Sequence, residues 1–507
     1  MFLLASDCSV RQNVILLPDA IEHTPDKMYQ PRIIIIGCGV GGLTTALQLH
    51  AHGFKDVHLF EAASSLTTLG VGINVQPSAV LHLRDLGLLP ALQATGVETA
   101  AINYFDRHGN AIISEARGIR AGYTIPQFSI HRGELQMLLL DAVRERLGDD
   151  RVHLNHALAT FSEASLPHIG TGYAAESSGE TITAYFVRRR DPDTPPEVPT
   201  MSADLMIAAD GINSTVRRLL YPTEGPPRFS GRMLWRGCVE RAPYLTGASM
   251  VWSGHANQKF IAYPISSACA RRGTSFVNWI AELRVRDEKD PDTTPPEKTD
   301  WTMTVPKERF AGKFKDWTFG FLNVPELIDS TEKVFEFPMC DRDPAPQWTF
   351  GRLTLLGDAA HPMYPIGSNG ASQAILDASA LVKCLLAHPS IAEIPQALLD
   401  YQNERLPVTA KIVMANRANG PDHVLQVAHE RAPNGFKDIH DIISKEELDG
   451  IGLAYKAIVG LEMEKVNEAA KATEGTAEAK GLKPPAAWLV GGEGGLGSKV
   501  KQANGTH

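Results

Sequence analysis

The clearest pattern of hydrophobic positions lies near the start of the chain, over residues 31–61. Four consecutive isoleucines at 33–36 form an uninterrupted apolar run, which is typical of a parallel strand buried on both faces. After a glycine-rich turn, Leu43 and Leu47 are spaced as on one side of a helix, and a second apolar run then ends at Glu61. The pattern predicts a strand, a helix and a second strand in succession.

Similar apolar runs return far along the chain. "LMIAAD" at 205–210 and "LTLLGD" at 353–358 each end in an aspartate, and a helical pattern follows each of them. From about 228 to 348 the chain contains short β-rich pieces such as "SFVNWIAEL", and helical periodicity dominates afterwards. We therefore predict an α/β protein in which a β-rich segment interrupts a domain of parallel strands and helices.

Polar stretches mark the expected boundaries. The proline-rich residues 186–200 and 285–300 are predicted to be exposed loops. Residues 1–30 form an extension, and the tail from about 470, rich in Ala, Gly, Lys and Glu, is predicted to be mobile. The predicted divisions are a dinucleotide domain in two parts at 31–227 and 349–420, a mainly β substrate domain at 228–348, and a helical C-terminal region with a flexible tail at 421–507.

Gly37, Gly39 and Gly42 form a G-x-G-x-x-G motif between the first strand and the first helix. In such a motif the first glycine permits a tight turn, the second lets the backbone approach a pyrophosphate, and the third lets the helix pack closely. The carboxylate of Glu61 can accept hydrogen bonds from a ribose diol. A second G-x-G-x-x-G within 491–497 has no buried strand before it and no room for a second strand–helix unit after it. We therefore assign dinucleotide binding to the first motif alone.

Two other segments suggest contacts with a bound nucleotide. Arg132 lies at the start of the helix predicted in "SIHRGELQMLLLDAV", where a cation opposes the helix dipole. The position is explained if Arg132 reaches a phosphate or a ribityl chain, and an ordinary surface arginine is the alternative. In "LMIAADGINSTVRRLL" a strand leads to Asp210 and Gly211, and a helix begins near Ser214. This combination is more specific than an Asp-Gly turn alone.

Composition narrows the choice of partners. The net charge of −9 disfavours a nucleic-acid partner, which would require a basic face. No stretch approaches the ~20 apolar residues that a membrane span needs, and no targeting segment is visible, so we expect a cytoplasmic protein. The six cysteines are scattered without the Cys and His spacing of a zinc site, and we predict no metal centre.

Together, the glycine turn with Glu61, "DGINSTVR" and "GDAAHPMYPIGSNG" resemble the FAD-dependent aromatic hydroxylases, the single-component flavoprotein monooxygenases of the p-hydroxybenzoate and salicylate hydroxylase type. The resemblance covers roughly residues 31–418 and is greatest to the members that act on phenazines, in stretches such as "LGVGINVQPSAV" and "PMCDRDPAPQW". It implies FAD as cofactor, NADH or NADPH and O₂ as co-substrates, and a small aromatic substrate. It also implies a discontinuous Rossmann-type FAD-binding domain of the glutathione-reductase type, with an antiparallel β-sheet substrate domain and a helical C-terminal region.

By this resemblance, Asp358 binds the ribityl hydroxyls of FAD, and Pro365 and the loop from Gly367 to Gly370 lie beside the isoalloxazine ring. The residue types agree with these roles, because prolines hold a loop in shape and glycines let backbone N–H groups approach a planar ligand. The helix predicted from about Ala371 aims its positive end at the flavin, where it would stabilise negative charge on the reduced ring.

Other expected site residues come from separate parts of the chain. Gly72 and Ile73, in "LGVGINVQ", are expected to form the opposite wall of the flavin site. Arg236 in "LWRGCV" could anchor a substrate carboxylate or contact the flavin, and Tyr263 in "FIAYPIS" could hydrogen-bond a phenol. The alternatives are an ordinary ion pair for the arginine and ordinary packing for the tyrosine. His361 is predicted to be a structural hydrogen-bonding residue.

The resemblance implies hydroxylation of an electron-rich aromatic ring through a flavin C4a-hydroperoxide, with or without decarboxylation. The segment at Asp210 is implied to contact both FAD and NAD(P)H. Two alternatives stay open, namely an FAD-dependent oxidase or dehydrogenase on the same fold and a non-catalytic flavin-fold escort or sensor. The sequence leaves open whether the substrate is a phenol, an aromatic acid or a phenazine-like heterocycle, which nicotinamide cofactor is used, and whether the protein is a monomer or a homodimer.

Overall fold

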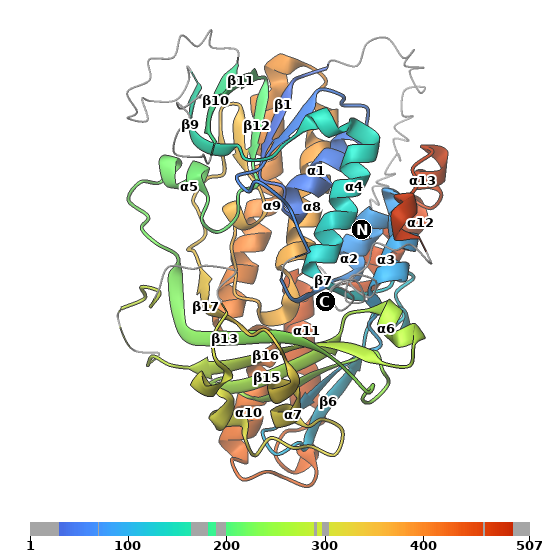
Figure 1. The fold of residues 1–507 in the computed structure, drawn as a ribbon, viewed down its shortest axis with the longest axis vertical. Coiled ribbons are helices and arrows are strands. Elements are labelled where there is room, and N and C mark those ends of the chain that lie inside the picture. Colours follow the sequence, from blue (N-terminus) through green and yellow to red (C-terminus); the bar gives the residue numbers. More distant parts are fainter. Residues whose placement is uncertain are drawn as a thin grey trace, which may run out of the picture.

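The computed structural model describes residues 30–489, except 69, 164–180, 189–198, 288–289, 291, 297–303 and 460–461. The predicted N-terminal extension, apart from its last residue, and most of the loop predicted at 186–200 lie outside the described residues. Figure 1 shows two halves along the long axis of the molecule. The upper half contains a parallel sheet with its helices, and the lower half contains a larger sheet.

The upper half is built on a six-stranded sheet in the order β18-β19-β12-β1-β2-β8. All neighbouring strands are parallel except β18, which pairs in antiparallel with β19 at one edge. The apolar runs seen in the sequence are therefore adjacent strands, as a discontinuous Rossmann-type domain requires. The strands are β1 (Ile33–Ile36), β2 (Val57–Phe60), β8 (Val152–His153), β12 (Leu205–Ala208), β18 (Thr349–Phe350) and β19 (Leu353–Leu355).

Helices pack against this sheet and against one another. α1 contacts both α4 and α8, and α8 contacts α9. With the turn before it, α8 is long and apolar enough to cross a membrane by those two criteria alone, but its packing between α1 and α9 is that of a core helix. The helices of this half are α1 (Val40–Ala51), α2 (Pro77–Asp85), α3 (Leu89–Thr95), α4 (Arg132–Leu147), α5 (Thr215–Leu220), α8 (Gly370–Ala387) and α9 (Ile394–Arg417).

The remaining strands outside the lower half form two three-stranded antiparallel sheets. One is formed by β9, β10 and β11, and the second places β7 between β3 and β4. Their bounds are β3 (Gly72–Val75), β4 (Val97–Glu98), β7 (Phe128–His131), β9 (Ala157–Glu163), β10 (Ile182–Val187) and β11 (Thr200–Ala203). β3 carries two of the predicted flavin-site residues.

The lower half is a seven-stranded sheet in the order β17-β13-β16-β15-β14-β5-β6. Its neighbours are antiparallel except β14 and β5, which are parallel. The predicted antiparallel sheet is confirmed, but its strands do not all come from 228–348. Because Ala101 pairs with Ser249, the local pattern could not reveal this long-range partner. The strands are β5 (Ala101–Phe105), β6 (Ala111–Ala116), β13 (Arg228–Arg241), β14 (Ser249–His255), β15 (Gln258–Pro264), β16 (Ser275–Arg284) and β17 (Phe335–Asp341).

Successive residues along these strands face two separate hydrophobic clusters, as the pleat of a strand requires. One face packs toward the C-terminal helices and includes Leu234, Trp252, Ile261 and Ile280. The other face includes Trp235, Phe260 and Trp279 and packs against residues 305–334, among them α7 (Val324–Ser330). α6 (Ser267–Arg271) lies between β15 and β16 in the chain.

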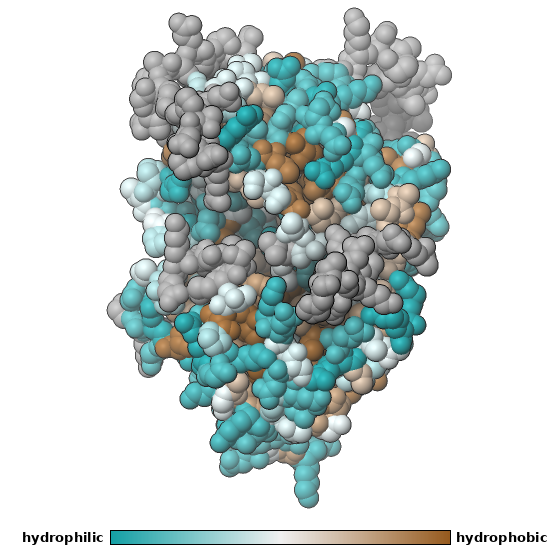
Figure 2. All heavy atoms as spheres, viewed as in Figure 1, coloured by the Kyte–Doolittle hydropathy of each residue, from teal (hydrophilic) through white to brown (hydrophobic). Residues whose placement is uncertain are grey.

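The C-terminal region is helical, as predicted. Of the tail expected to be mobile from about 470, residues 490–507 lie outside the described residues, and the part up to 489 is packed together with α12. The apolar side chains of Val466, Ala470 and Trp488 are buried, and Trp488 donates a hydrogen bond from Nε1 to the Asp141 carboxylate on α4 at 2.8 Å. This segment therefore packs on the upper half. The helices are α10 (His423–Arg431), α11 (Lys445–Val459), α12 (Met463–Ala472) and α13 (Thr476–Ala479). Figure 2 shows a largely hydrophilic surface, with hydrophobic residues in the upper half and around the middle of the molecule.

Candidate active site

The turn between β1 and α1 has the shape that the G-x-G-x-x-G motif predicts. Gly37 has φ +101°, and a Cβ added to Gly42 would lie 2.1 Å from the Gly37 carbonyl oxygen, so neither position accepts a side chain. A Cβ on Gly39 would have no atom within 4 Å, which leaves this backbone open to a ligand. The free N–H groups at the start of α1 favour an anion at that point.

Glu61 follows β2 and lies beside the same turn. Its Oε2 accepts a hydrogen bond from the Cys38 N–H at 2.9 Å, and its Oε1 accepts one from the Ala63 N–H at 2.9 Å. These bonds hold the carboxylate next to the glycine turn. That is where a ribose diol must be held if the pyrophosphate lies at the start of α1.

A cavity of about 300 Å³ runs from this turn to the seven-stranded sheet. A volume of this size suits a small-molecule ligand. Of the residues predicted for the site, the cavity is lined by Gly39, Gly72, Ile73, Arg132, Arg236, Tyr263, Asp358, Pro365, Gly370 and Ala371. Those that do not line it are Gly37, Gly42, Glu61, Asp210 and Gly367. The structure thus brings together residues from six separate parts of the chain.

Asp358 lies in the 3-10 turn Gly357–Ala359, directly after β19, and its carboxyl is open to the cavity. Enclosure by the surrounding protein raises the pKa of this carboxyl, while the positive fields of His361 and Arg132 oppose the rise. Among the described residues, the Asp358 carboxyl has no hydrogen-bond or ion-pair partner. A Cβ on Gly370 would lie 3.9 Å from Asp358 Oδ1, so the carboxyl also lies near the start of α8.

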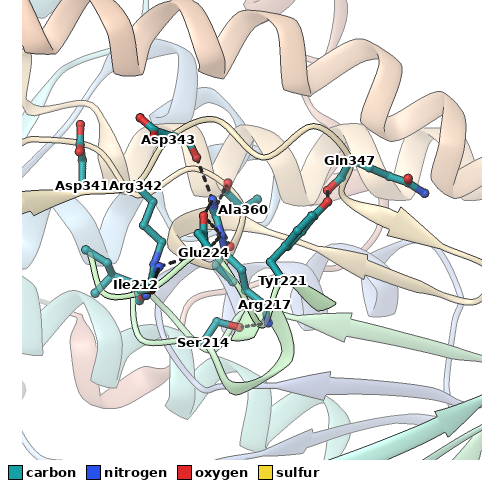
Figure 3. A network of polar contacts seen from close by, with 12 residues as sticks. Ile212, Ser214, Arg217, Tyr221, Glu224, Asp341, Arg342, Asp343, Gln347 and Ala360 are labelled. Carbon is teal, nitrogen blue, oxygen red and sulfur yellow. Dashed lines mark hydrogen bonds and ion pairs between the residues drawn. The ribbon is translucent and has the colours of Figure 1, made fainter. Parts of the chain in front are cut away.

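A buried arginine holds the turn that carries Asp358 (Figure 3). Arg217, on α5, is 1% exposed. Its Nη1 donates to the carbonyl oxygens of Ala359 and Ala360 at 3.2 and 2.7 Å. Its Nη2 donates to the Asp343 carbonyl oxygen at 2.8 Å and to the Glu224 carboxylate at 2.5 Å. One guanidinium therefore fixes the backbone on the C-terminal side of Asp358.

The same network extends to the segment after β17. Arg342 pairs through Nη1 with Glu224 Oε2 at 3.0 Å, and its Nε donates to the Ile212 carbonyl oxygen at 3.0 Å (Figure 3). Because Glu224 is shared by two arginines, it joins the end of the seven-stranded sheet to the segment of Gly211. The two halves of the molecule are thus tied together here.

Asp210 does not line the cavity, and its carboxylate makes hydrogen bonds within the protein. Its carboxylate caps α5, accepting a hydrogen bond from the Ser214 hydroxyl at 2.5 Å and one from the Thr215 N–H at 2.8 Å. The adjacent Gly211, with φ +80°, lines the cavity instead. Asp210 therefore shapes the turn, and Gly211 presents its backbone to a ligand. A direct cofactor contact by Asp210 stays a prediction.

A second buried network holds the Asp358 turn from its other side. Asp377, on α8, accepts hydrogen bonds at Oδ2 from the Gly357 N–H at 3.0 Å and pairs with His361 Nε2 at 2.6 Å. Its Oδ1 accepts from Arg405 Nε at 2.7 Å. His361 thus has the structural hydrogen bond that was predicted for it.

We expect the Asp377 network to make the free energy of unfolding depend on pH in the acidic range. Burial alone would raise the pKa of Asp377, but His361 and Arg405 together lower it from 3.8 to about 2. A carboxyl whose pKa falls on folding contributes stability that is complete above about pH 4 and is lost as the pH falls toward 2. Asp377→Asn should lower the free energy of unfolding at pH 7 by about 2 kcal/mol. Urea unfolding between pH 7 and pH 3 should show a smaller acid-dependent loss in the variant, and an equal loss in both proteins would contradict the assignment.

Arg236 and Tyr263 line the cavity and both bind the backbone of Gly72. Tyr263 Oη donates to the Gly72 carbonyl oxygen at 2.8 Å, and Arg236 Nη2 donates to the same oxygen at 3.0 Å. On the other side, the Gly72 N–H donates to Asn278 Oδ1 at 2.7 Å. Burial raises the pKa of Tyr263 to about 12, so the phenol stays protonated and donates. Both side chains position β3, and their predicted roles in catalysis stay predictions.

Gly72 is closely surrounded by other side chains, so a methyl group added there should lower the stability of the protein. A Cβ there would lie 2.7 Å from Tyr263 Cε2 and 2.9 Å from Asn278 Cβ. We expect Gly72→Ala to lower the free energy of unfolding by about 1–3 kcal/mol, because the neighbours must move. Gly450→Ala is the matched control, since a Cβ on that helical residue meets nothing within 4 Å. Urea unfolding that ranks the two variants equally would show that Gly72 is not closely packed in solution.

The inner end of the cavity holds a buried ionic cluster that was not predicted. Lys259 Nζ donates to Asp422 Oδ2 at 2.5 Å and lies 3.4 Å from Glu282 Oε2. Arg232 Nη1 lies 3.6 Å from Glu282 Oε1. Burial opposes the charge of Lys259, but Asp422 and Glu282 outweigh it and raise the pKa of the lysine. Lys259 lies four residues before Tyr263 on β15, so alternation along the strand places both on the same face. This spacing could have shown from the sequence that Lys259 belongs to the site.

The loop before α8 contains Gly367, which packs against Tyr455. Gly367 has φ +73°, and a Cβ there would lie 2.1 Å from the Tyr455 hydroxyl oxygen. Tyr455 Oη in turn donates to Asn416 Oδ1 at 2.8 Å and accepts from Asn369 Nδ2 at 2.7 Å. Gly367 is therefore needed for packing under α11, away from the main cavity. Pro365 and Gly370 lie on the cavity side, as predicted.

The arrangement of the main cavity fits FAD. The backbone at Gly39 and the start of α1 suit a pyrophosphate, and the Asp358 carboxyl, which has no partner among the described residues, suits a row of ribityl hydroxyls. The Arg132 side chain also has no ion pair among the described residues and lines the same cavity. The described part of the chain contains no group of three or more His, Cys, Asp or Glu side chains that could hold a metal ion.

Comparisons with known proteins agree with this geometry. The FAD binding domain family matches residues 30–309 and 323–416. The chain is 41% identical over 389 residues to phenazine 1,6-dicarboxylic acid hydroxylase from Lysobacter antibioticus. The aligned residues span 76% of this chain and 89% of that protein. It is 30% identical over 389 residues to 3-amino-4-hydroxybenzoate 2-monooxygenase from Streptomyces cremeus, spanning 75% of this chain and 84% of that one.

Solved structures show the same fold. A salicylate hydroxylase substrate complex covers 87% of this chain and 98% of its own, with a TM-score of 0.63 and 21% identity. CtdE in complex with FAD covers 84% of this chain and 100% of its own, with a TM-score of 0.59 and 21% identity. The family match extends over more than half of the chain, and the flavin-site residues predicted from it lie mostly around one cavity. The chain therefore belongs to the FAD binding domain family and, within it, to the FAD-dependent aromatic hydroxylases.

Proposed function

We propose that this protein is a single-component monooxygenase that uses NAD(P)H and O₂ to hydroxylate an aromatic carboxylic acid of the phenazine type. One observation carries the proposal, namely that a single cavity joins the backbone of Gly39 and the carboxyl of Asp358 to the apolar wall of Trp252 and Ile261. A nucleotide and a flat aromatic ring can therefore meet in one enclosed space.

When bound, FAD supplies the redox chemistry, taking electrons from NAD(P)H and activating O₂ for transfer of one oxygen atom to the ring. The chain holds and orients the two reactants. Glu61 and Asp358 bind hydroxyl groups of the cofactor, and Arg132 lies where it can reach a phosphate or the ribityl chain. The N-terminus of α8 stabilises negative charge beside it.

The substrate part of the cavity combines apolar walls with a few polar groups. Leu234, Trp252, Ile261 and Ile280 provide flat apolar surface, which excludes water from the reacting ring. Arg236 offers a positive charge to a substrate carboxylate while it holds Gly72, and the Tyr263 oxygen, whose proton is donated to Gly72, can accept a hydrogen bond from a substrate hydroxyl. The phenazine class is favoured because the 41%-identical relative acts on a phenazine dicarboxylic acid.

The test is a substrate panel with product analysis. The FAD-loaded protein is mixed with NADH or NADPH in air, and oxidation is followed with phenazine-1-carboxylate, phenazine-1,6-dicarboxylate, salicylate and phenol. We expect a phenazine acid to accelerate the oxidation and a product that carries ¹⁸O from ¹⁸O₂. The product mass also separates simple hydroxylation from hydroxylation with loss of CO₂.

Hydrogen peroxide measured in the same samples distinguishes the alternatives. Formation of peroxide alone with every aromatic compound would overturn the hydroxylase proposal in favour of an oxidase. Hydroxylation of salicylate or phenol, with no response to either phenazine acid, would keep the reaction class and overturn the phenazine assignment.

A further inference from the structure

Two further cavities lie in a row with the active-site cavity. A small one, of about 40 Å³, shares Trp252 and Asp422 with the wall of the active-site cavity. A larger one, of about 330 Å³, shares Arg117 and Lys456 with the small one. We call the small cavity the neck and the larger one the vestibule. Neighbouring spaces thus have wall residues in common.

The vestibule offers apolar surface suited to a flat ring. Its walls come from Gln76 and Pro77, from residues between 116 and 127, and from residues 453–457 and 462–464. Tyr123 and Met463 are half-buried, and Leu453 is 65% exposed. A cavity of this size with aromatic and apolar side chains in its wall suits a small ligand.

A group of three charges lies between the vestibule and the neck. Glu115 Oε2 lies 3.0 Å from Arg117 Nη2 and 3.1 Å from Lys456 Nζ. Two cations thus share one carboxylate, which leaves a surplus positive charge where the two cavities meet. Two acids also line the vestibule, but Glu462 is paired with Lys465 and Glu464 is exposed. A ligand carboxylate can therefore take the place of Glu115 beside Arg117 and Lys456.

We propose that the vestibule binds the aromatic carboxylate substrate before it reaches the active site, and that the neck is its way in. This rests on the proposed function for the identity of the ligand. The ring lies against Tyr123 and Leu453, and the carboxylate pairs with Arg117 and Lys456. At the inner end of the neck, the carboxylate of Asp422 is neutralised by Lys259.

The neck must open for a ring to pass. Its volume of about 40 Å³ is comparable to the space that one water molecule occupies. α11 lies directly against the three charges, since a Cβ on Gly452 would be 3.1 Å from Glu115 Oε1. Exchange of Glu115 for the ligand carboxylate breaks both ion pairs that join Glu115 to its neighbours. Binding in the vestibule thereby releases the contact of Lys456, on α11, with β6.

Chemical protection tests the binding site without turnover. In the FAD-loaded Leu453→Cys variant, N-ethylmaleimide alkylates a thiol at the rim of the vestibule. Phenazine-1-carboxylate at about ten times its Kd should slow this alkylation about tenfold, and unsubstituted phenazine should protect less. Unprotected alkylation up to the solubility limit of the acid would overturn the proposal. Because no reaction is required, this result stands even if the hydroxylase assignment fails. The unsubstituted protein, alkylated in parallel, gives the background from its own cysteines.

Charge variants test the passage, because they should change KM in opposite directions. The double variant Arg117→Gln with Lys456→Gln should raise KM for phenazine-1-carboxylate about tenfold, while Glu115→Gln should lower it, because the competing carboxylate is gone. Lys383→Gln removes one exposed charge on α8, away from the vestibule, and is the control. A change of KM in the same direction for both vestibule variants, or in neither, would show that the substrate takes another route.

Discussion

Replacement of Arg217 by alanine should lower the free energy of unfolding by about 3–5 kcal/mol, because it leaves three backbone carbonyl oxygens without their buried donor and takes from Glu224 one of its two arginine partners. Arg217 is almost fully buried, and its contacts include the carbonyl oxygens of Ala359 and Ala360. Urea unfolding followed by circular dichroism measures the loss. FAD should also bind more weakly to the variant, since the turn of Asp358 loses its support.

Two variants control this experiment. Arg218→Ala removes an exposed arginine one residue further along α5 and should change the free energy of unfolding by less than about 0.5 kcal/mol. Arg217→Lys keeps the charge but loses the planar fork that reaches several acceptors at once, so its stability should lie between those of the parent and the alanine variant. If Arg217→Ala were as stable as Arg218→Ala, the buried network would not exist in solution.

Replacement of Asp358 by alanine should weaken FAD binding about ten- to hundredfold, because hydrogen bonds to a charged group contribute about 1.5–3 kcal/mol. The carboxyl opens on the cavity and has no partner among the described residues, so the variant loses no internal contact there. The affinity is measured by titration of flavin fluorescence with the apoprotein.

The stability of the apoprotein separates this effect from misfolding. Asp358→Ala should unfold at the same urea concentration as the parent when FAD is absent, and only the FAD-loaded proteins should differ. Asp149→Ala removes a carboxylate whose side chain is 84% exposed and should leave FAD affinity unchanged. Equal FAD affinity of the Asp358→Ala variant and the parent would mean that another group holds the ribityl chain.

The order of the sequence indicates where the residues assigned to the nucleotide come together, for a physical reason. The glycine turn, Glu61 and Asp358 each follow directly after an apolar strand, and parallel strands of one sheet end at a common edge. Local order along the chain therefore determined where these residues would meet. The cap on α5 is equally local, although the use of Asp210 as a cap became visible only in the three-dimensional structure.

The substrate part depended on distant pairing and was predicted less completely. Lys259 meets Asp422 across 163 residues, and Arg236 and Tyr263 meet on one carbonyl group because β13, β16 and β15 are neighbours. No local pattern records such a register. A buried lysine in an apolar strand was nevertheless a signal, because a charge in that place requires a partner.

The pairing of β5 with β14 has a consequence for synthesis of the protein in the cell. β5 and β6 form a hairpin as soon as both have been made, but one side of β5 stays unpaired until Ser249–His255 emerges. At a rate of about 5–20 residues per second, the ribosome needs roughly 7–30 s to cover that distance. During this time an edge containing Ile102 and Tyr104 is free to pair with another nascent chain. The soluble yield of this enzyme is therefore expected to rise with the supply of chaperones and to fall when many copies are made at once.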